Sequence, residues 1–265
     1  MSSSIEPRLC IFIPSYNARD FLRATVKRIP WTSLPPGMHY ELLFIDNAST
    51  DGTPAAIATI RTELEEDGVR THARLHQINQ GYGGSVKAAF SFCLEHGFDF
   101  IAVLHADGQY APEALPGLIS ALISAPGAAL HFGSRLTGQP LKGGMPMYKF
   151  LANHGLSKLQ NLCIGLRLSE YHSGYRLYRL KHLQGLPWQH LSDGFVIDNE
   201  IICMIHKGGF LITESSIPTY YGKEKSHVPR IGTPLAILHN LGRYLLAHWG
   251  LRRDLRYSIS RSREV

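Results

Sequence analysis

The stretch FIAVLHADGQY, residues 100–110, decides the fold. It begins as a short apolar run of β-forming residues and ends in three polar side chains, His105, Asp107 and Gln109. Such a run is typical of a buried strand. Side chains able to hold a metal or a phosphate, placed directly after a strand, are typical of the ligand-binding edge of an α/β sheet. The stretch therefore predicts an α/β protein with a ligand site where this strand ends.

The rest of the first half repeats this pattern of short apolar runs alternating with helix-like segments. The other predicted strands are residues 9–14, 40–46, 73–78 and 129–134. The predicted helices are residues 18–29, 53–66, 84–96 and 112–124. This alternation predicts a Rossmann-like nucleotide-binding half, with a mostly parallel sheet covered by helices on both faces.

The second half is less regular but contains no low-complexity linker or internal repeat. Its predicted elements are helices over 145–165, 195–208 and 234–249 and a strand over 209–218. We therefore expect a single domain over residues 1–251, followed by a basic C-terminal tail over 252–265.

Polar side chains follow four predicted strands at the point where each strand ends. These clusters lie at residues 14–17, 46–49, 79–81 and 105–109. Any one of them is explained by turn chemistry, because Asn, Asp, Ser and Gly all favour turns. Four clusters at the carboxyl ends of parallel strands instead favour one shared ligand site.

Composition narrows the class of protein. The 27 Lys and Arg against 21 Asp and Glu give a net charge of +6, which indicates an anionic partner. We expect no nucleic-acid binding, because basic residues interleaved with aromatics are missing outside the tail. The four cysteines have no C-x-x-C spacing, and no run of about 18 apolar residues or signal-like N-terminus occurs. These features predict a soluble cytoplasmic protein.

Six motifs in a fixed order carry a family resemblance. They are IFIPSYNA (11–18), FIDNASTDGT (44–53), NQGYGGSVKAAF (79–90), LHADGQY (104–110), GSR (133–135) and SGYRLYR (173–179). As an ordered set they resemble the inverting family 2 glycosyltransferases of GT-A fold, and most of all the polyprenyl-phosphate, dolichol-phosphate mannose synthase-like branch. The resemblance implies transfer of a sugar from a UDP- or GDP-sugar to a polyprenyl phosphate or a glycan. The alternative is a catalytically weak sugar-nucleotide-binding or scaffold protein.

The resemblance also implies a set of donor-binding residues. Those expected to bind the nucleotide sugar are Pro14, Tyr16, Asp46, Asn79, Asp107 and Arg135. Asp46 matches the family aspartate that accepts a hydrogen bond from the base. Its alternative role is as a cap for the helix that begins near Thr53, although Asp51 suits that role better.

A divalent metal, Mg²⁺ or Mn²⁺, is expected as cofactor, because the diphosphate leaving group must be neutralised. Asp107 matches the second aspartate of the family Asp-x-Asp motif, and Gln109 matches its glutamine. His105 stands in place of the first aspartate. It is expected either to ligate a metal such as Mn²⁺ or to hydrogen-bond the diphosphate as a cation.

On the acceptor side, the resemblance implies that Arg135, Lys149 and Arg176 face the acceptor phosphate. The alternative is that they are ordinary solvated cations. A hydroxyl acceptor needs a base, whereas an ionised phosphate needs much less help. The catalytic candidates are therefore Asp107, Glu170 and Asp198, with Asp193 as a further candidate base.

The C-terminal segment combines a leucine-rich helix with five arginines that follow it. These arginines are Arg252, Arg253, Arg256, Arg261 and Arg263. One interpretation is a peripheral contact of helix and tail with the inner membrane face. The equal alternative is a helix packed on the core with a solvated tail. The loop GKEKSH (222–227) keeps the Lys and Ser of a loop found in the lipid-linked branch.

Overall fold

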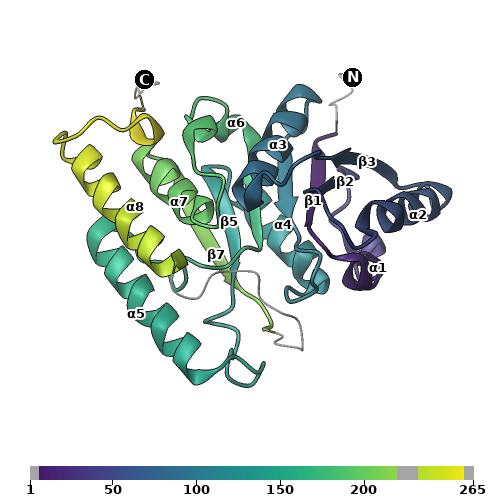
Figure 1. Ribbon diagram of the computed structural model, residues 1–265, viewed down its shortest axis with the longest axis horizontal. Coiled ribbons are helices and arrows are strands. Elements are labelled where there is room, and N and C mark those ends of the chain that lie inside the picture. The colour runs from purple at the N-terminus through teal and green to yellow at the C-terminus, as the bar shows by residue number, and fades with distance from the viewer. Residues whose placement is uncertain (1–5, 220–231, 260–265) are drawn as a thin grey trace.

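The computed structural model describes residues 6–219 and 232–259, which form a seven-stranded sheet between two layers of helices (Figure 1). The strands are β1 (Arg8–Ser15), β2 (His39–Asp46), β3 (Arg70–Leu75), β4 (Phe100–Val103), β5 (Ala128–Ser134), β6 (Arg176–Arg179) and β7 (Leu211–Ser216). Their order is β3-β2-β1-β4-β6-β5-β7, and only the pairings made by β6 are antiparallel. The predicted α/β class with a mostly parallel sheet is confirmed.

Helices cover both faces of the sheet. They are α1 (Arg19–Lys27), α2 (Thr53–Glu66), α3 (Gly81–Glu95), α4 (Leu115–Ser124), α5 (Met147–Ile164), α6 (Leu180–Leu183), α7 (Ile197–Lys207) and α8 (Gly232–His248). Short 3-10 turns lie at Trp31–Ser33, Pro112–Ala114, Trp188–His190 and Leu255–Tyr257. Buried side chains of α1, α2 and α4 pack on one face, and those of α3, α7 and α8 pack on the other.

Strand β1 shows why its sequence is an unbroken apolar run. Leu9, Ile11 and Ile13 point to the face covered by α1, α2 and α4, whereas Cys10 and Phe12 point to the face covered by α3 and α7. Successive side chains of a strand alternate between faces. A central parallel strand therefore needs apolar residues at every position, since both of its faces are buried.

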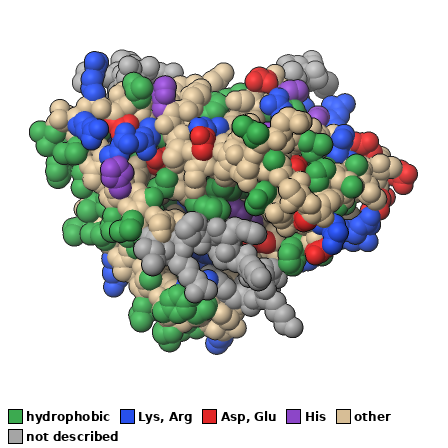
Figure 2. Space-filling view, in the orientation of Figure 1, with side chains coloured by type: hydrophobic (Ala, Val, Ile, Leu, Met, Phe, Trp, Pro, Cys, Tyr) green, Lys and Arg blue, Asp and Glu red, His purple; other side chains and the backbone are tan. Residues whose placement is uncertain are grey.

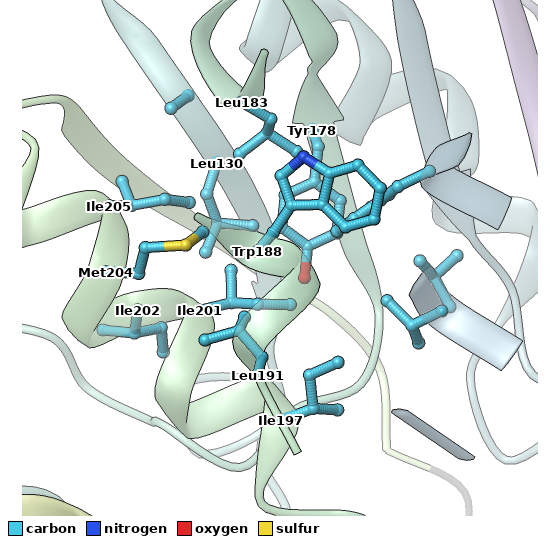
Figure 3. Packing of buried hydrophobic residues seen from close by; sticks show 14 of the residues in the cluster. Leu130, Tyr178, Leu183, Trp188, Leu191, Ile197, Ile201, Ile202, Met204 and Ile205 are labelled. Carbon is cyan, nitrogen blue, oxygen red and sulfur yellow. The ribbon is translucent and has the colours of Figure 1, made fainter. Parts of the chain in front are cut away.

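The second half of the chain is held to the sheet by an aromatic and aliphatic cluster around Trp188 (Figure 3). Figure 3 shows the Trp188 indole among Tyr178 and Leu130 from the sheet and Ile201 from α7. The same indole meets the Phe90 ring edge-on at a centroid distance of 5.7 Å. Because Phe90 belongs to α3, this cluster joins the two halves of the protein.

Among the strands of the sheet, β6 is the one that the sequence did not predict. Its four residues are too few to show a periodic pattern, and its partners lie far away in the chain. Arg176, the first residue of β6, pairs with Val103 of β4 and with Phe132 of β5. Because β6 runs antiparallel, the segment that precedes it, residues 170–175, reaches the same edge of the sheet as the carboxyl ends of the parallel strands.

Three residues of the segment after α8, Asp254, Arg256 and Tyr257, pack against the body of the protein. Arg256 forms an ion pair with the buried Glu200 of α7, and Tyr257 is buried beside Tyr244 of α8, with a ring centroid distance of 5.3 Å. Residues 254–257 are thus part of the packed structure, whereas the sequence predicts a tail from residue 252 onward. Arg261, Arg263 and the loop 222–227 lie outside the described residues.

Candidate active site

The residues predicted to bind the donor come together at one edge of the sheet. Asp46 is the last residue of β2, the 105–109 loop follows β4, and Arg135 follows β5. These three strands point the same way, because β1 pairs in parallel with β2 and β4, and the antiparallel β6 lies between β4 and β5. Carboxyl ends of parallel strands form a common edge, the usual ligand-binding edge of such sheets.

Asp46 is buried, and one of its carboxylate oxygens has no hydrogen-bond partner among the described residues. Its Oδ2 accepts a hydrogen bond from the Ser49 backbone N–H at 3.0 Å. Its Oδ1 is buried and has no hydrogen-bond partner among the residues that the structure describes. A buried oxygen without a partner is costly, and a base N–H would satisfy it. Asp46 does not cap α2: the N-cap residue is Gly52, and it is Asp51 Oδ1 that accepts from the Thr53 backbone N–H at 3.0 Å.

The loops after β1 and β2 lock together beside Asp46. The Asn17 backbone N–H donates to Ser49 Oγ, and the Thr50 backbone N–H donates to Asn17 Oδ1, each at 2.9 Å. Pro14 is half-buried and Tyr16 is exposed on the same loop. The predicted donor residues of β1 therefore lie next to the base-binding candidate on a braced loop.

Asn79 acts in the structure as a link between β2 and α3. Its Oδ1 accepts from Asn47 Nδ2 at 2.9 Å and from the Gly81 backbone N–H at 2.8 Å. Asn47 Oδ1 in turn accepts from the Gln80 backbone N–H at 2.9 Å. Asn79 is thus close to Asp46 in space, and it fixes where α3 begins.

The 105–109 loop is shaped by its own turn and anchored to α1. Asp107 Oδ1 accepts from the Gln109 backbone N–H at 3.1 Å, and Gly108 between them has a left-handed φ of 67°. Thr25 Oγ1 of α1 donates to the Ala106 carbonyl at 2.8 Å. The carboxylate of Asp107 is consequently held at the end of β4 by a fixed loop.

His105 is held by aromatic neighbours that the sequence analysis did not single out. Its ring stacks on Tyr82 with centroids 5.4 Å apart and approaches Tyr110 at 5.3 Å. Tyr82 also stacks on Phe195 at 5.6 Å, and its hydroxyl lies 3.4 Å from His105 Nε2. Tyr82 lies in the GYGG stretch that opens α3. The glycine-rich start of this helix was the only feature of the sequence that could have pointed to Tyr82.

Glycines on both sides of Tyr82 explain its position. A Cβ on Gly81 would lie 2.3 Å from the Asp193 carbonyl oxygen, and a Cβ on Gly83 would lie 2.3 Å from the Ser192 carbonyl oxygen. The Gly83 backbone N–H donates to the Asp193 carbonyl at 2.7 Å. Asp193, a candidate base, forms an ion pair with Lys87 at 2.7 Å. The start of α3 therefore docks against the segment that precedes α7.

Glu170 and Arg135 form one buried unit. Glu170 is fully buried, and its Oε1 accepts from Arg135 Nε at 3.0 Å and also from Arg135 Nη2. Its Oε2 accepts from the Arg135 backbone N–H at 2.7 Å. Both oxygens of Glu170 are therefore occupied, so this carboxylate positions Arg135 and is poorly suited to act as a base.

Arg176 lies in the interior rather than at an open surface. It is fully buried, and its three nitrogens donate to the backbone carbonyls of Ser173, Asp198 and Tyr171 at 2.7–2.9 Å. Its Nε is also 3.5 Å from Asp198 Oδ1. This arrangement favours a role in fixing Asp198 and the 171–175 segment over direct contact with an acceptor phosphate.

Asp198 is the acceptor-side carboxylate with the most unusual environment. Burial raises its pKa, and the charges of Arg176 and His105 oppose that rise. Nearby, burial lowers the pKa of His172 to about 4. Neither ring nitrogen of His172 has a hydrogen-bond partner among the described residues. Lys149 is half-buried in the first turn of α5.

Residues 10–186 match the domain Glycosyl transferase family 2. The chain belongs to glycosyl transferase family 2. It is 26% identical over 249 residues to polyprenol monophosphomannose synthase of Mycolicibacterium smegmatis, covering 94% of this chain and 89% of that protein. It is 29% identical over 194 residues to undecaprenyl-phosphate mannosyltransferase of Micrococcus luteus, covering 72% of this chain and 75% of that protein.

The fold of this family 2 glycosyltransferase also resembles solved structures. Glucosyl-3-phosphoglycerate synthase from Mycobacterium tuberculosis, in complex with Mn²⁺, UDP and glucosyl-3-phosphoglycerate, superposes with a TM-score of 0.60. The identity is 15%, and the match covers 94% of this chain and 82% of that one. At this identity the likeness supports the GT-A fold alone. The family and the fold implied by the six sequence motifs are confirmed.

The donor set suits a metal that is shared with a substrate. Within residues 6–219 and 232–259, no three His, Cys, Asp or Glu side chains are grouped so that they could hold a metal ion by themselves. Mg²⁺ and similar ions, however, are commonly bound by one or two carboxylates together with substrate phosphates and water. Asp107, on its anchored loop, fits that kind of open site.

Proposed function

We propose that this glycosyltransferase moves a sugar, with inversion, from a UDP- or GDP-sugar to the phosphate of a polyprenyl phosphate. The observation that carries the proposal is the meeting of Asp46, Asp107 and Arg135 at the ends of β2, β4 and β5. A base-binding carboxylate, a metal-binding carboxylate and a buried cation on one edge match the parts of a nucleotide-diphosphate donor and an anionic acceptor.

On the donor side, Asp46 Oδ1 would accept the ring N–H of uracil or guanine, with Pro14, Tyr16 and Asn79 shaping the pocket. Asp107 would hold Mg²⁺ or Mn²⁺, with His105 and Gln109 beside it. The metal, when bound, would neutralise the charge that develops on the leaving diphosphate. His105 would contact the diphosphate from a ring orientation that Tyr82 maintains.

On the acceptor side, Arg135 and Lys149 would neutralise the acceptor phosphate. A phosphate oxygen then attacks the anomeric carbon, the bond from that carbon to the diphosphate breaks, and the nucleoside diphosphate leaves with the bonding electrons. An ionised phosphate has no proton to lose, so no general base is required. This agrees with the engagement of both Glu170 oxygens by Arg135.

A glycan hydroxyl is the second candidate acceptor, because Asp198 Oδ1 is buried and has no hydrogen-bond partner among the described residues. The two mannosyltransferase relatives favour the polyprenyl phosphate, since their names specify polyprenol and undecaprenyl-phosphate substrates. No helix of the described chain is long and apolar enough to cross a membrane. We propose that the protein works in the cytoplasm, in peripheral contact with the membrane that holds its acceptor.

A transfer assay tests this proposal. Purified protein is incubated with UDP- and GDP-sugars, Mn²⁺ or Mg²⁺, and either a short-chain polyprenyl phosphate or an oligosaccharide. We expect a glycosyl phosphate of inverted anomeric configuration with one donor, and its loss in the Asp107→Asn variant but not in Asp20→Asn, an exposed control on α1. Product on the oligosaccharide alone would establish the hydroxyl acceptor. No nucleotide binding at all would contradict the enzyme assignment.

A further inference from the structure

Helices α5 and α8 present apolar side chains to solvent. On α5 these are Met147, Tyr148, Leu151, Leu159 and Leu162. On α8 and the turn after it they are Leu235, Leu238, Leu246, Trp249 and Leu251. Leu159 and Leu162 on α5, and Leu235 and Leu238 on α8, are three residues apart, a spacing that places side chains on one side of a helix. The outer face of a surface helix is ordinarily polar, so a side chain such as Leu162, 82% exposed, calls for a partner.

The two helices lie side by side at one end of the molecule, and Figure 2 shows hydrophobic side chains gathered over this end. We call the ten exposed side chains named above, together with the cations around them, the α5–α8 surface. Trp249 and Tyr148 belong to it, and Trp and Tyr are the residues that favour a membrane–water interface.

The exposed charged side chains of these two segments are basic. Residues 135–169 contain five Lys or Arg and no Asp or Glu, although the chain has 21 acidic residues in total. Residues 232–253 contain three Arg and again no acidic residue. Lys158 and Arg167 on the α5 side and Arg252 and Arg253 after α8 are exposed. An apolar surface ringed by cations is suited to an anionic lipid surface, which attracts basic residues near it.

We propose that the α5–α8 surface docks this protein onto an anionic membrane, with α5 as a principal contact. The proposal rests on the lipid-linked acceptor of the proposed function. A second copy of the chain is a poorer occupant, because pairing two such surfaces would bring like charges together, which is unfavourable at an interface.

Helix α5 is connected to the candidate active site, so docking through α5 would bring the acceptor side of that site to the membrane. The loop before α5 packs on the end of the 211–219 segment, where a Cβ on Gly143 would lie 2.0 Å from the Thr219 carbonyl oxygen. Thr219 Oγ1 donates to the Arg135 carbonyl at 3.3 Å, and Thr219 also bridges to Tyr110. The N-terminal end of α5 therefore lies next to the acceptor side, so a lipid phosphate at the membrane surface would meet Arg135 and Lys149.

Vesicle co-sedimentation tests the docking. Full-length wild-type protein is mixed with vesicles of phosphatidylglycerol and phosphatidylcholine, and with vesicles of phosphatidylcholine alone. We expect binding to the anionic vesicles that weakens with added salt. The double variant Leu151→Glu/Leu162→Glu should reduce that binding about tenfold or more, because it replaces two inserting side chains by anions.

The matched control is Leu75→Glu/Ile78→Glu, which changes two exposed apolar residues at the opposite end of the sheet, Ile78 being 72% exposed. It should bind vesicles as the wild type does. Equal loss in both double variants, or no binding by the wild type, would overturn the docking proposal. So would a change from dimer to monomer in the α5 variant by light scattering, which would identify the surface as a self-association interface.

Activity separates this proposal from the proposed function. The α5 variant should lose transfer to a long-chain polyprenyl phosphate in vesicles and keep transfer to a short, water-soluble polyprenyl phosphate. Loss of both activities in a folded variant would show that α5 acts inside the site and would contradict docking. A wild type that uses neither acceptor would refute the proposed function, while the vesicle-binding result would stand on its own.

Discussion

The donor half of the sheet, β1 to β4, and the acceptor half, β5 to β7 with α5, α7 and α8, differ in what the buried charged groups near the candidate site contact. In the donor half, Asp46 keeps a buried oxygen without a protein partner among the described residues. In the acceptor half, Glu170, Arg176 and Glu200 are fully buried and already paired. At the end of β2 a buried carboxylate oxygen thus lacks a protein partner, whereas most of the buried charges near the site on the acceptor side are paired with one another, although Asp198 Oδ1 accepts no hydrogen bond from the described residues. Removal of a carboxylate should therefore weaken ligand binding in the donor half and lower the free energy of unfolding in the acceptor half.

The largest effect is expected at Asp107. Asp107→Asn should reduce kcat about a thousandfold, because several kcal/mol of transition-state stabilisation depend on the metal that this carboxylate would hold. The unfolding transition should stay close to that of the wild type, since the loop is anchored independently through Thr25 and the Ala106 carbonyl. Turnover close to that of the wild type in saturating Mn²⁺ would remove Asp107 from the mechanism.

In the acceptor half the corresponding effect should be on folding. Glu170→Ala leaves Arg135 without its buried partner and should lower the free energy of unfolding by about 3–5 kcal/mol. Glu113→Ala breaks the exposed Arg28–Glu113 pair, 2.8 Å long, in the donor half. It should cost about 1 kcal/mol or less. Urea denaturation measures both values. Similar losses for the two variants would show that burial of the Arg135–Glu170 pair adds no stability over an exposed pair.

A smaller effect is expected for nucleotide affinity. Asp46→Ala should weaken binding of the cognate nucleoside diphosphate by about 1–3 kcal/mol, the cost of leaving a buried hydrogen-bonding group unpaired. The matched variant Asp51→Ala removes the hydrogen bonds that Asp51 accepts from Thr53 at the start of α2 and should lower the free energy of unfolding by about 1 kcal/mol with affinity unchanged. Calorimetry that finds the same affinity in the wild type and Asp46→Ala would show that another residue recognises the base.

The smallest effect is expected at Tyr82, which joins the two halves. Its hydroxyl lies 3.4 Å from His105 Nε2, a long contact, so Tyr82→Phe should change kcat only a few-fold. Tyr82→Ala removes the stacking on both His105 and Phe195 and should lower kcat further while leaving nucleotide affinity nearly unchanged. If Tyr82→Phe is as inactive as Tyr82→Ala, the hydroxyl acts on the substrate directly and the stacking is not its main role.

The donor half was predictable because the positions of its candidate binding residues follow from the regular alternation of strands and helices in the sequence. Apolar runs alternate with helices, and parallel strands deliver Asp46 and Asp107 to one edge by topology alone. The position of β3 was less well predicted: it spans Arg70–Leu75, whereas the sequence predicts residues 73–78. Its exposed edge position demands fewer apolar residues, so the pattern there is weak.

The acceptor half was less predictable because its key contacts join residues far apart in the chain. The sequence identifies Glu170, Arg135 and Arg176 as charged residues in family motifs, but burial and pairing decide what each one does. Nothing in the local sequence shows that both Glu170 oxygens face Arg135, or that β6 inserts between β4 and β5 and buries Arg176. Tyr82 was missed for the same reason, since its partners His105 and Phe195 come from other segments.

The central claim is that the ends of β2 and β4 form a preassembled donor site, and metal-dependent nucleotide binding tests it most directly. UDP and GDP are titrated into the wild type, Asp46→Ala and Asp107→Asn, each with and without Mn²⁺. We expect Mn²⁺ to tighten binding of one nucleotide to the wild type. Asp46→Ala should weaken binding under both conditions, and Asp107→Asn should lose only the part that depends on Mn²⁺. Identical titrations for all three proteins would contradict a donor site at this edge of the sheet.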